Sequence, residues 1–366
     1  MIDEINIKGF RGLRDFSMSN LGRINLLVGT NNSGKSSILE AIELMSSKGS
    51  VRPIWSATSR RGELLWSDDD TRRYSEADVS HLFYGHRFNV GSRFEISDFS
   101  GGDNNRFSVE VVSIPDDSRD LLVAPQSSEM GDSLGLKLEW TNGLPKQSLL
   151  APLTPRGGLS SRLGRIPIDR NDLPPIQFIS TGSLLPEEVQ SLFDDVVLTP
   201  EEDLLVEALR TIEPDIERIA SIGSDRTRSA SVIRQGNIVV KLKNHRDRIP
   251  IGSMGDGIWR MLGIALSLVN ARNGILLIDE IDTGLHYSVL SKMWHLVQST
   301  AERLNVQVFA TTHSRDCFES LASISHDDIS EDSCVTIQRI EKNAKQAISF
   351  TEQEIVAASE RGIEVR

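Results

Sequence analysis

The stretch "LLVGTNNSGKSS" (residues 26–37) constrains the fold more than any other part of this sequence. It matches the pattern G-x-x-x-x-G-K-[ST], in which a glycine-rich turn curls backbone N–H groups around phosphate oxygens. The apolar run from Ile24 to Val28 predicts a buried strand before the turn. Apolar residues at helical spacing after the turn predict a helix, whose N-terminus favours anions. A chance match in a polar turn would lack this strand and helix.

This loop predicts a nucleotide site with ATP and Mg²⁺ as cofactors. Lys35 supplies a cation for the β- and γ-phosphates, and the Ser36 hydroxyl supplies a ligand for Mg²⁺. The candidate nucleotide-binding residues of the loop are Gly29, Thr30, Asn31, Asn32, Ser33, Gly34, Lys35, Ser36 and Ser37.

A second motif, "NGILLIDEIDTGLHYS" (273–288), places an apolar strand, Ile275 to Ile278, directly before two carboxylates. Asp279 at the end of this strand suits a bound Mg²⁺, and Glu280 suits the activation of an attacking water molecule. The plain alternative is an ordinary turn at a strand end.

Two further stretches flank this carboxylate motif. The stretch "GSMGDGIWRMLGIALSLVNA" (252–271) starts with a small turn at Ser253 and Gly255 and continues as an apolar helix. The stretch "VQVFATTHS" (306–314) predicts a buried strand that ends in His313. Taken alone, a histidine such as His313 more often packs in the core, but its place at a strand end beside "TT" favours a residue that responds to the nucleotide.

The order of these four motifs resembles the ATPase core of the ABC superfamily. The opening "INIKGFRGLRDF" and the stretch "LLIDEIDTGLHYS" resemble the RecF and OLD-type (overcoming-lysogenization-defect) AAA-family ATPases more than transporters. The resemblance implies an α/β fold, with a mixed sheet, flanking helices and no long coiled coil. It places the ATPase core in residues 1–48 and 235–366, with a large inserted β and helical lobe over residues 49–234.

The resemblance also implies roles for single residues. It assigns Mg²⁺ to Ser36 and Asp279, the general base to Glu280, and the sensing of the γ-phosphate to His313. Ser253 and Gly255 correspond to the signature turn that closes on the ATP of a second subunit. Arg11 is expected to touch the nucleotide or to relay its state.

The sequence departs from the ABC pattern at two places. His286 stands where transporters carry an aspartate, and the glutamine that usually lies between the phosphate loop and the signature has no clear match. The segment 75–86 either replaces that glutamine or packs as part of a lid.

The inserted region has its own predicted organisation. Residues 49–87 are polar and charge-balanced and predict an irregular surface arm, whereas residues 88–143 alternate like strands. Residues 145–175 predict a loop or linker rich in Pro, Gly and Ser. Residues 184–222 predict helices, and "SVIRQGNIVVKLK" (231–243) predicts a hairpin.

The charge of the chain limits the classes of binding partner. The net charge of −12 argues against nucleic-acid binding over the whole surface, although a local basic patch stays possible. One such patch contains Lys146, Arg156, Arg162, Arg165 and Arg170. It is either a solvated loop or a contact for phosphates or a partner.

The location expected from the sequence is the cytoplasm. The chain has no apolar run long enough for a membrane span and no signal-peptide pattern, so no membrane partner is expected. Its two cysteines, Cys317 and Cys334, are not spaced as metal ligands and suit a reducing compartment.

Three functions stay open at this point. The first is a regulatory ATPase whose ATP-dependent homodimer, or higher homo-oligomer, controls a separately encoded effector. That effector is expected to be a nuclease in an anti-phage defence system, because the residues after His313 are too few for a nuclease domain. The second is a RecF-like DNA-repair ATPase that binds DNA when ATP is bound. The third is a phosphatase of free nucleotides, which a site shared between subunits disfavours.

Overall fold

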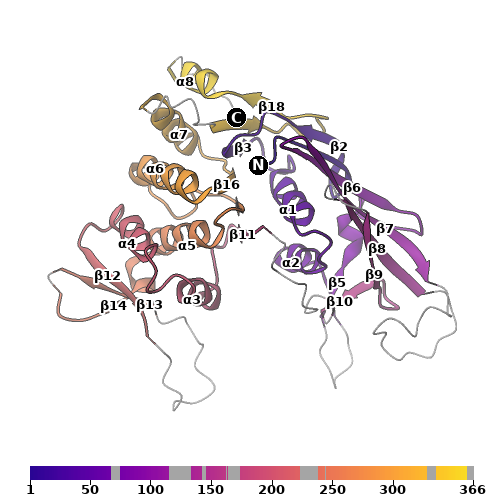
Figure 1. Cartoon of the computed structure of the whole chain (residues 1–366), viewed down its shortest axis with the longest axis horizontal. Coiled ribbons are helices and arrows are strands. Elements are labelled where there is room, and N and C mark those ends of the chain that lie inside the picture. Colours follow the sequence, from indigo (N-terminus) through magenta and orange to yellow (C-terminus); the bar gives the residue numbers. More distant parts are fainter. Residues whose placement is uncertain are drawn as a thin grey trace, which may run out of the picture. The chain divides into compact units, whose positions relative to one another are not determined.

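The chain forms two compact units, each built from segments that are far apart in the sequence (Figure 1). The computed structural model describes residues 1–66, 75–114, 133–141, 146–161, 163, 174–222, 238–243, 245–327 and 335–360. Unit 1 consists of Met1–Leu21, Asn31–Leu173 and Ile340–Ser349. Unit 2 consists of Gly22–Thr30, Pro174–Arg339 and Phe350–Arg366. The expected division into an ATPase core (1–48 and 235–366) and an inserted lobe (49–234) follows function and not compactness, and it stays a prediction.

Unit 1 contains an antiparallel sheet with the strand order β2-β1-β6-β7-β8-β9. Its strands are β1 (Glu4–Phe10), β2 (Leu13–Met18), β6 (Arg93–Ser100), β7 (Asp103–Ile114), β8 (Ser133–Thr141) and β9 (Gln147–Pro152). One face is apolar because alternate side chains point to opposite faces of a strand. On that face the ring of Phe94 contacts Phe10, Phe83 and Phe107, with ring centroids 5.1 to 6.4 Å apart. The strands predicted for residues 88–143 are confirmed where the structure describes that span, as β6, β7 and β8, whereas residues 115–132 and 142–143 lie outside the described residues.

Two predictions for the rest of unit 1 are wrong. Residues 49–87 are not an irregular arm, and residues 145–175 are not wholly a loop. They contain α2 (Arg52–Arg60), β4 (Leu64–Trp66), β5 (Ser75–Asp78), the short 3₁₀ helix η1 (Val79–Leu82), β9 and β10 (Gly158–Ser160). Their pairing partners are remote, since β5 lies between β10 and β4, and β9 pairs with β8. A polar local sequence gives little sign of such long-range pairing.

Unit 2 contains a parallel sheet with the order β11-β15-β16-β3-β17, followed by β18, which spans the boundary between the units. The strands are β3 (Ile24–Val28), β11 (Ile176–Ile179), β15 (Ile275–Ile278), β16 (Gln307–Thr311), β17 (Val335–Arg339) and β18 (Ile348–Phe350). Every side chain of β3, β15 and β16 is buried, as in parallel sheets that are covered on both faces. The strands predicted at Ile24–Val28 and Ile275–Ile278 are confirmed.

Helices flank this parallel sheet and complete the core of unit 2. They are α3 (Pro186–Asp194), α4 (Glu202–Arg210), α5 (Asp256–Asn270), α6 (Tyr287–Leu304), α7 (Arg315–Asp327) and α8 (Glu352–Glu360). Helix α6 packs between α5 and α7 (Figure 1). The buried indole of Trp294 on α6 donates a hydrogen bond to the carbonyl of Cys317 on α7, at 3.1 Å. None of the described helices is long and apolar enough to cross a membrane.

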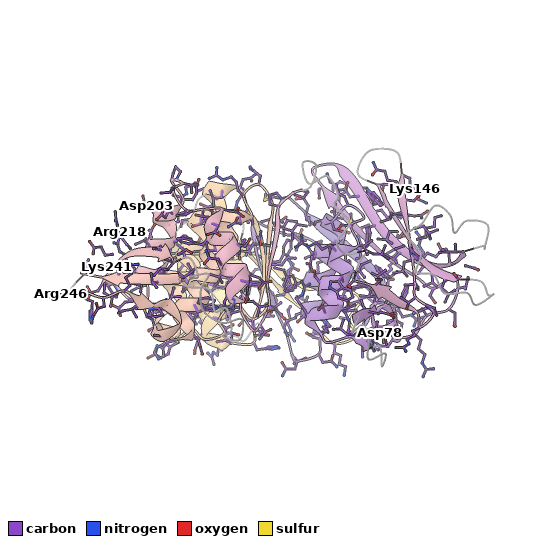
Figure 2. All side chains as sticks on the ribbon, turned by 90° about the horizontal axis from the view of Figure 1, so that it is seen from below. Asp78, Lys146, Asp203, Arg218, Lys241 and Arg246 are labelled. Carbon is purple, nitrogen blue, oxygen red and sulfur yellow. The ribbon has the colours of Figure 1, made fainter. Side chains whose placement is uncertain are left out.

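A small antiparallel sheet of unit 2 corrects the helical prediction for residues 184–222. It consists of β12 (Ile216–Ser221), β13 (Ile238–Leu242) and β14 (Ile249–Pro250). Ile216 and Ile219 are three residues apart, as in a helix, yet both are buried because the register shifts between Ile216 and Arg218. The hairpin prediction for 231–243 lies partly outside the described residues, and Ile238–Leu242 pairs with β12 and β14. Figure 2 shows Arg218 and Lys241 of this sheet near Arg246.

Gly274, which precedes β15, generates a test of this fold. A Cβ atom at Gly274 would lie 1.9 Å from the backbone oxygen of Pro175, next to the β11–β15 pairing. We expect Gly274→Ala to lower the free energy of unfolding by about 1–3 kcal/mol, because the backbone must shift. Gly12→Ala is the matched control, since among the described residues, its chain neighbours aside, no atom lies within 4 Å of a Cβ there. Equal denaturant midpoints for the two variants would contradict the close approach.

Candidate active site

The predicted catalytic residues of unit 2 meet at one edge of its parallel sheet. Strands β11, β15, β16 and β3 are neighbours and run in the same direction, so their carboxyl ends share this edge. Asp279 and Glu280 follow β15, His313 lies two residues after β16, and Gly29 follows β3. Ligands of open α/β sheets bind at this edge. The structure therefore brings the carboxylates, the histidine and the start of the phosphate loop to one place.

The turn at Asp279 and Glu280 is held by threonine hydroxyls from neighbouring strand ends. Thr311 Oγ1 donates to Asp279 Oδ1 at 2.8 Å and accepts from the Glu280 N–H at 2.8 Å. Thr181 Oγ1 donates to Asp279 Oδ2 at 3.2 Å. Glu280 itself adopts a left-handed conformation with φ of 52°. Such a conformation costs about 1–3 kcal/mol for a residue other than glycine, so its surroundings must impose it.

Arg260 of α5 holds the other side of this turn. Its side chain is 1% exposed, and its guanidinium donates to the carbonyls of Asp279, Glu280 and Ser180 at 2.7 to 2.8 Å. Burial lowers the pKa of Arg260 to about 10, while the carboxylates of Asp282, Asp279 and Glu280 oppose that shift. The guanidinium is therefore charged at neutral pH. One buried cation thus ties the carboxyl ends of β11 and β15 to α5.

Two more polar contacts complete the edge. His313 Nε2 lies 3.1 Å from Glu280 Oε1, which places the predicted sensor beside the predicted base. Thr312 Oγ1 donates to Asp282 Oδ1 at 2.6 Å. The histidine is 38% exposed, so it is a surface group at the edge of the sheet and not a core histidine.

The phosphate loop leads from β3 into α1 (Lys35–Ser46). Asn32 and Gly34 have φ values of 60° and 105°, which bend the loop into a tight turn. No side chain caps the N-terminus of α1, and its first turn contains no acidic residue. The buried Ser33 hydroxyl has no hydrogen-bond partner within the described residues, and the side chain of Lys35 is buried. An uncapped helix start beside an unsatisfied hydroxyl suits a bound phosphate group.

Arg11 lies in unit 1 and is engaged with carboxylates. Its side chain is 3% exposed, with Nε 2.6 Å from Glu40 on α1 and Nη1 2.8 Å from Glu63. Glu40 also contacts Arg61, whose Nη2 lies 3.4 Å from the Ser37 hydroxyl. Arg11 is therefore tied to the helix that begins with Lys35. Of its two expected roles, this placement fits the relay better than direct contact with nucleotide.

The signature turn lies at the start of α5. Ser253 belongs to the short 3₁₀ helix η5 (Ile251–Met254), and Gly255 has φ of 97° directly before α5. Ser253, Gly255 and Asp256 are exposed. A Cβ added at Gly255 would meet no atom within 4 Å among the described residues. The turn is therefore open to a group from outside unit 2.

The two departures from the ABC pattern have structural counterparts. His286 is the N-cap of α6, and its Nδ1 contacts the Ser288 hydroxyl at 2.9 Å. Residues 75–86 form β5 and η1, where Asp78 accepts a hydrogen bond from the Ser80 N–H at 3.0 Å. Both contacts cap the start of a helix, and residues 75–86 contain no glutamine.

Sequence reasoning missed Arg260, Thr311 and Thr181. Arg260 lies in the quoted signature stretch, but its position among apolar helix residues gave no sign that it contacts strand ends. Thr311 lies just before His313 in the "TT" pair, a polar stop to an apolar strand that signals a strand-end site. Thr181 has no signal of this kind. The arginines at 162, 165 and 170 of the predicted basic patch lie outside the described residues, and Lys146 Nζ pairs with Glu139 at 2.8 Å.

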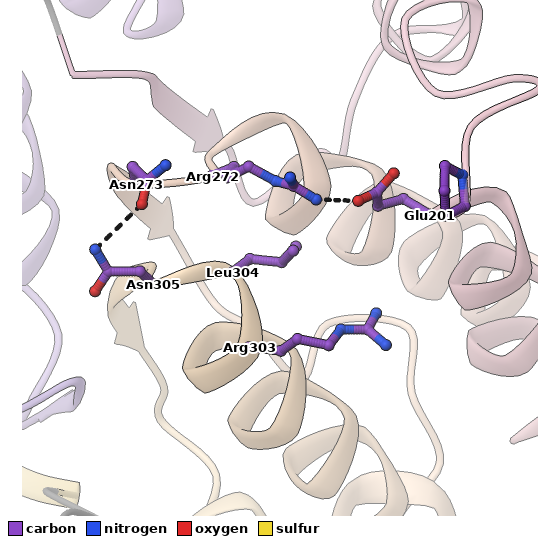
Figure 3. Close-up of a pocket in the computed structure, with 7 residues that line it drawn as sticks. Glu201, Arg272, Asn273, Arg303, Leu304 and Asn305 are labelled. Carbon is purple, nitrogen blue, oxygen red and sulfur yellow. Dashed lines mark hydrogen bonds and ion pairs between the residues drawn. The ribbon is translucent and has the colours of Figure 1, made fainter.

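A pocket of about 400 Å³ lies elsewhere in unit 2, at the amino ends of β15 and β16 (Figure 3). Its lining includes Glu201, Arg272, Asn273, Arg303 and Asn305. Because Asp279 and His313 lie at the carboxyl ends of these strands, this pocket is not the candidate nucleotide site.

The donor set fits Mg²⁺. Ser36 and Asp279 offer hydroxyl and carboxylate oxygens, and Mg²⁺ prefers oxygen ligands from one or two side chains together with phosphates of a nucleotide. The threonine hydroxyls that fix the Asp279 carboxylate are typical supports for such a ligand.

Comparison with known proteins supports this reading of the fold. The crystal structure of an SMC head bound to the C-winged helix domain of ScpA matches with a TM-score of 0.50 and 14% identity, over 96% of this chain and 98% of that chain. This likeness concerns the fold, a mixed α/β P-loop ATPase-like fold similar to SMC head domains.

Two curated relatives match at the level of sequence. An "ATP/GTP phosphatase" of Helicobacter pylori is 20% identical over 344 residues, covering 88% of each chain. An uncharacterized protein of Methanocaldococcus jannaschii is 38% identical over 102 residues, covering 27% of this chain and 44% of its own length.

A family model described as "AAA domain, putative AbiEii toxin, Type IV TA system" matches residues 24–316, which is most of the chain. This span contains the phosphate loop, the signature turn, the Asp279–Glu280 turn and His313. The chain therefore belongs to this AAA-domain family of P-loop ATPases.

Proposed function

We propose that this protein is a regulatory ATPase of the RecF and OLD-like group, in which two copies share each ATP site and the dimer controls a separate effector. The observation that carries the proposal is the link through α5. At one end of this helix the signature turn is exposed, and one turn further on Arg260 holds the carbonyls of Asp279 and Glu280. A contact between this turn and the nucleotide of a neighbouring subunit would thus be transmitted through α5 to Asp279 and Glu280 of the same subunit.

In this mechanism each residue has a defined task. The phosphate loop and Lys35 bind the phosphates, and Ser36 and Asp279 would hold Mg²⁺, which when bound neutralises charge on the β- and γ-phosphates. Glu280 accepts a proton from the attacking water. His313, 3.1 Å from Glu280, orients this carboxylate and changes partner when a γ-phosphate is present. Arg260 and Thr311 keep the turn in its left-handed form.

The family description bears on the class of effector. The family description names a toxin of a type IV toxin–antitoxin system, which supports a role in defence or growth control. A nuclease encoded on another chain is the effector we propose. To test this, the tagged protein is purified from its native host in the presence of ATP, and the co-purifying chains are identified. The effector is expected among the chains that are absent when the Lys35→Ala variant is purified in the same way.

We expect Glu280→Gln to bind ATP while its kcat falls by about 10²–10⁴-fold, because it loses the general base. The variant should accumulate as an ATP-dependent dimer, which light scattering after size exclusion detects. Glu302→Gln, at an exposed glutamate of α6, is the matched control and should behave like the wild type. Unchanged turnover in Glu280→Gln would place the base elsewhere.

A mixing experiment tests whether the site is shared. Ser253→Arg should block closure on a neighbour's phosphate, and Lys35→Ala should remove nucleotide binding, so each variant alone is inactive. In a mixed dimer one site carries both changes and the other carries neither. Each mixed dimer should therefore recover up to about half of the wild-type activity, and a statistical 1:1 mixture, in which about half of the dimers are mixed, up to about a quarter. Absence of recovery in subunits that demonstrably exchange would exclude a shared site.

A second candidate is a phosphatase of free nucleotides. The name of the Helicobacter pylori relative, which spans 88% of both chains, favours it. The two functions differ in how specific activity depends on protein concentration. A shared site loses activity per subunit on dilution, as dimers dissociate, whereas a site complete in one subunit keeps it. Assays with ATP and with GTP over the same dilution series therefore separate them.

Arg260 is proposed as a positioning residue and tested by kinetics. Hydrogen bonds from a charged group contribute about 1.5–3 kcal/mol each, and Arg260→Gln leaves buried carbonyls without a cation. We expect kcat to fall at least about tenfold with a smaller change in KM for ATP, and Arg260→Lys to recover part of kcat. Arg210→Gln is the control, because Arg210 also bonds a carbonyl, that of Ile216 at 2.7 Å, away from the turn. If Arg260→Gln lowers the free energy of unfolding but leaves kcat unchanged, Arg260 has only a structural role.

A further inference from the structure

Two histidines of unit 1 face each other on the segment that follows β5. His81 lies in η1, and His86 lies in the turn after it. Their Nδ1 atoms are 3.3 Å apart, and their ring centroids are 5.3 Å apart. The side chain of His81 is 39% exposed and His86 is an exposed residue, so a small solute can reach both rings. Neither histidine has a task in the ATPase mechanism described above.

The backbone around the pair is fixed, so the approach of the two rings is built into the fold. Gly85 and His86 have φ values of 83° and 57°, and the His86 N–H donates to the Phe83 carbonyl at 3.0 Å. Phe83 is buried, and the Tyr84 N–H donates to the carbonyl of Gly9 on β1 at 2.9 Å. A left-handed backbone is uncommon for residues with a side chain, although histidine adopts it more often than most. This tight turn therefore holds the His86 ring beside η1.

The distance between the two nitrogen atoms matches that of a transition-metal site. Imidazole nitrogens lie about 2.0–2.1 Å from Zn²⁺, and tetrahedral coordination then places two of them about 3.3–3.4 Å apart. The observed 3.3 Å agrees with this separation. A hydrogen bond between the two rings has the same length, so the distance must be combined with the surroundings of the second His81 nitrogen.

Asp78 favours one protonation state of His81. Its Oδ2 lies 3.5 Å from His81 Nε2, while its Oδ1 accepts a hydrogen bond from the Ser80 N–H at 3.0 Å. A carboxylate beside Nε2 favours the proton on that nitrogen and leaves Nδ1 with its lone pair on the side of His86. Histidines that bind metals typically donate their other ring nitrogen to a carboxylate in this way. His81 is thus arranged as a metal ligand with a supporting carboxylate.

His86 can join His81 as a ligand without a net loss of protons. In the neutral pair, Nδ1–H of His86 donates to Nδ1 of His81. When a metal binds, this proton moves through water to Nε2 of the exposed His86 ring, and both Nδ1 lone pairs then serve the cation.

The donor set selects the class of metal. Imidazole nitrogens suit Zn²⁺, Cu²⁺ and Ni²⁺, whereas Mg²⁺ and Ca²⁺ take oxygen ligands. Within the part of the chain that the structure describes, no group of three or more His, Cys, Asp or Glu side chains could hold a metal. The pair therefore forms an open site, in which water completes the coordination of the metal.

We propose that His81 and His86 bind a divalent transition metal, with zinc as the ion to test, and that Asp78 supports this site. The site uses none of the residues assigned to ATP, so its occupation does not depend on ATP hydrolysis. It does adjoin Arg11, whose N–H donates to the carbonyl of Leu82 at 2.9 Å. A bound metal would therefore restrain the segment that holds the Arg11 backbone.

The test counts the zinc ions that the untagged full chain binds. The protein is kept in excess Mg²⁺ without ATP, and Zn²⁺ is titrated in competition with a chromophoric chelator. The wild type should bind one zinc ion more than His81→Ala or His86→Asn, in which asparagine tolerates the left-handed backbone. Asp78→Asn keeps an acceptor for the Ser80 N–H but loses the carboxylate, so its zinc affinity should fall by about 10–100-fold.

His295→Ala is the matched control, because His295 is an exposed histidine on α6, and it should bind zinc like the wild type. Thermal unfolding gives a second measurement: zinc should raise the Tm of the wild type and of this control more than that of His81→Ala or His86→Asn.

Three outcomes would overturn the proposal. The first is an equal number of zinc ions on the wild type, His81→Ala and His86→Asn, which would leave the pair as a hydrogen bond between two imidazoles. The second is an equal loss of zinc in His295→Ala, and the third is displacement of the zinc by Mg²⁺. Because zinc binding is measured without ATP, its failure is distinguishable from a failure of the proposed ATPase mechanism.

Discussion

The contact between the Arg260 guanidinium and three strand-end carbonyls underlies much of the candidate site. Glu280 has a left-handed backbone that is unfavourable for its residue type, and its N–H and its carbonyl are each held from outside, by Thr311 and by Arg260. The same cation neutralises part of the charge of the nearby carboxylates, which oppose the lowering of its pKa by burial. Glu280, the residue proposed as the base, is therefore positioned in part by α5, the helix that follows Gly255.

The parallel sheet makes this arrangement possible. Parallel strands put their carboxyl ends at one edge, so residues separated by many positions along the chain become neighbours there. Asp279, Thr311 and Thr181 come from the ends of three adjacent strands. Because β15 and β16 are buried along their whole length, their polar residues lie at or just beyond the strand ends, where hydrogen bonds satisfy them. The apolar core of unit 2 thus leaves the polar side chains of the candidate site at the carboxyl edge of the parallel sheet.

Unit 1 holds α1, the helix into which the phosphate loop leads, through ion pairs. Arg11 and Arg61 both contact Glu40 on α1, the helix whose first residue is Lys35. Nearby on the same helix, burial raises the pKa of Glu43, against the effect of Arg60. The helix is held by buried or half-buried ion pairs, which tolerate little change of geometry. This network gives Arg11 a physical basis for a relay role.

The sequence by itself determined the phosphate loop, the strands Ile24–Val28 and Ile275–Ile278, and the carboxylates that follow the second strand. These features are local: a glycine-rich turn, an unbroken apolar run and a polar stop are visible within a few residues. Only the tertiary structure decided the elements within residues 49–87 and 145–175, since their pairing partners are remote. It also decided that Ile216 and Ile219 belong to a bulged strand, and that Arg260 reaches β11 and β15. Those outcomes depend on contacts between distant segments, which no local pattern encodes.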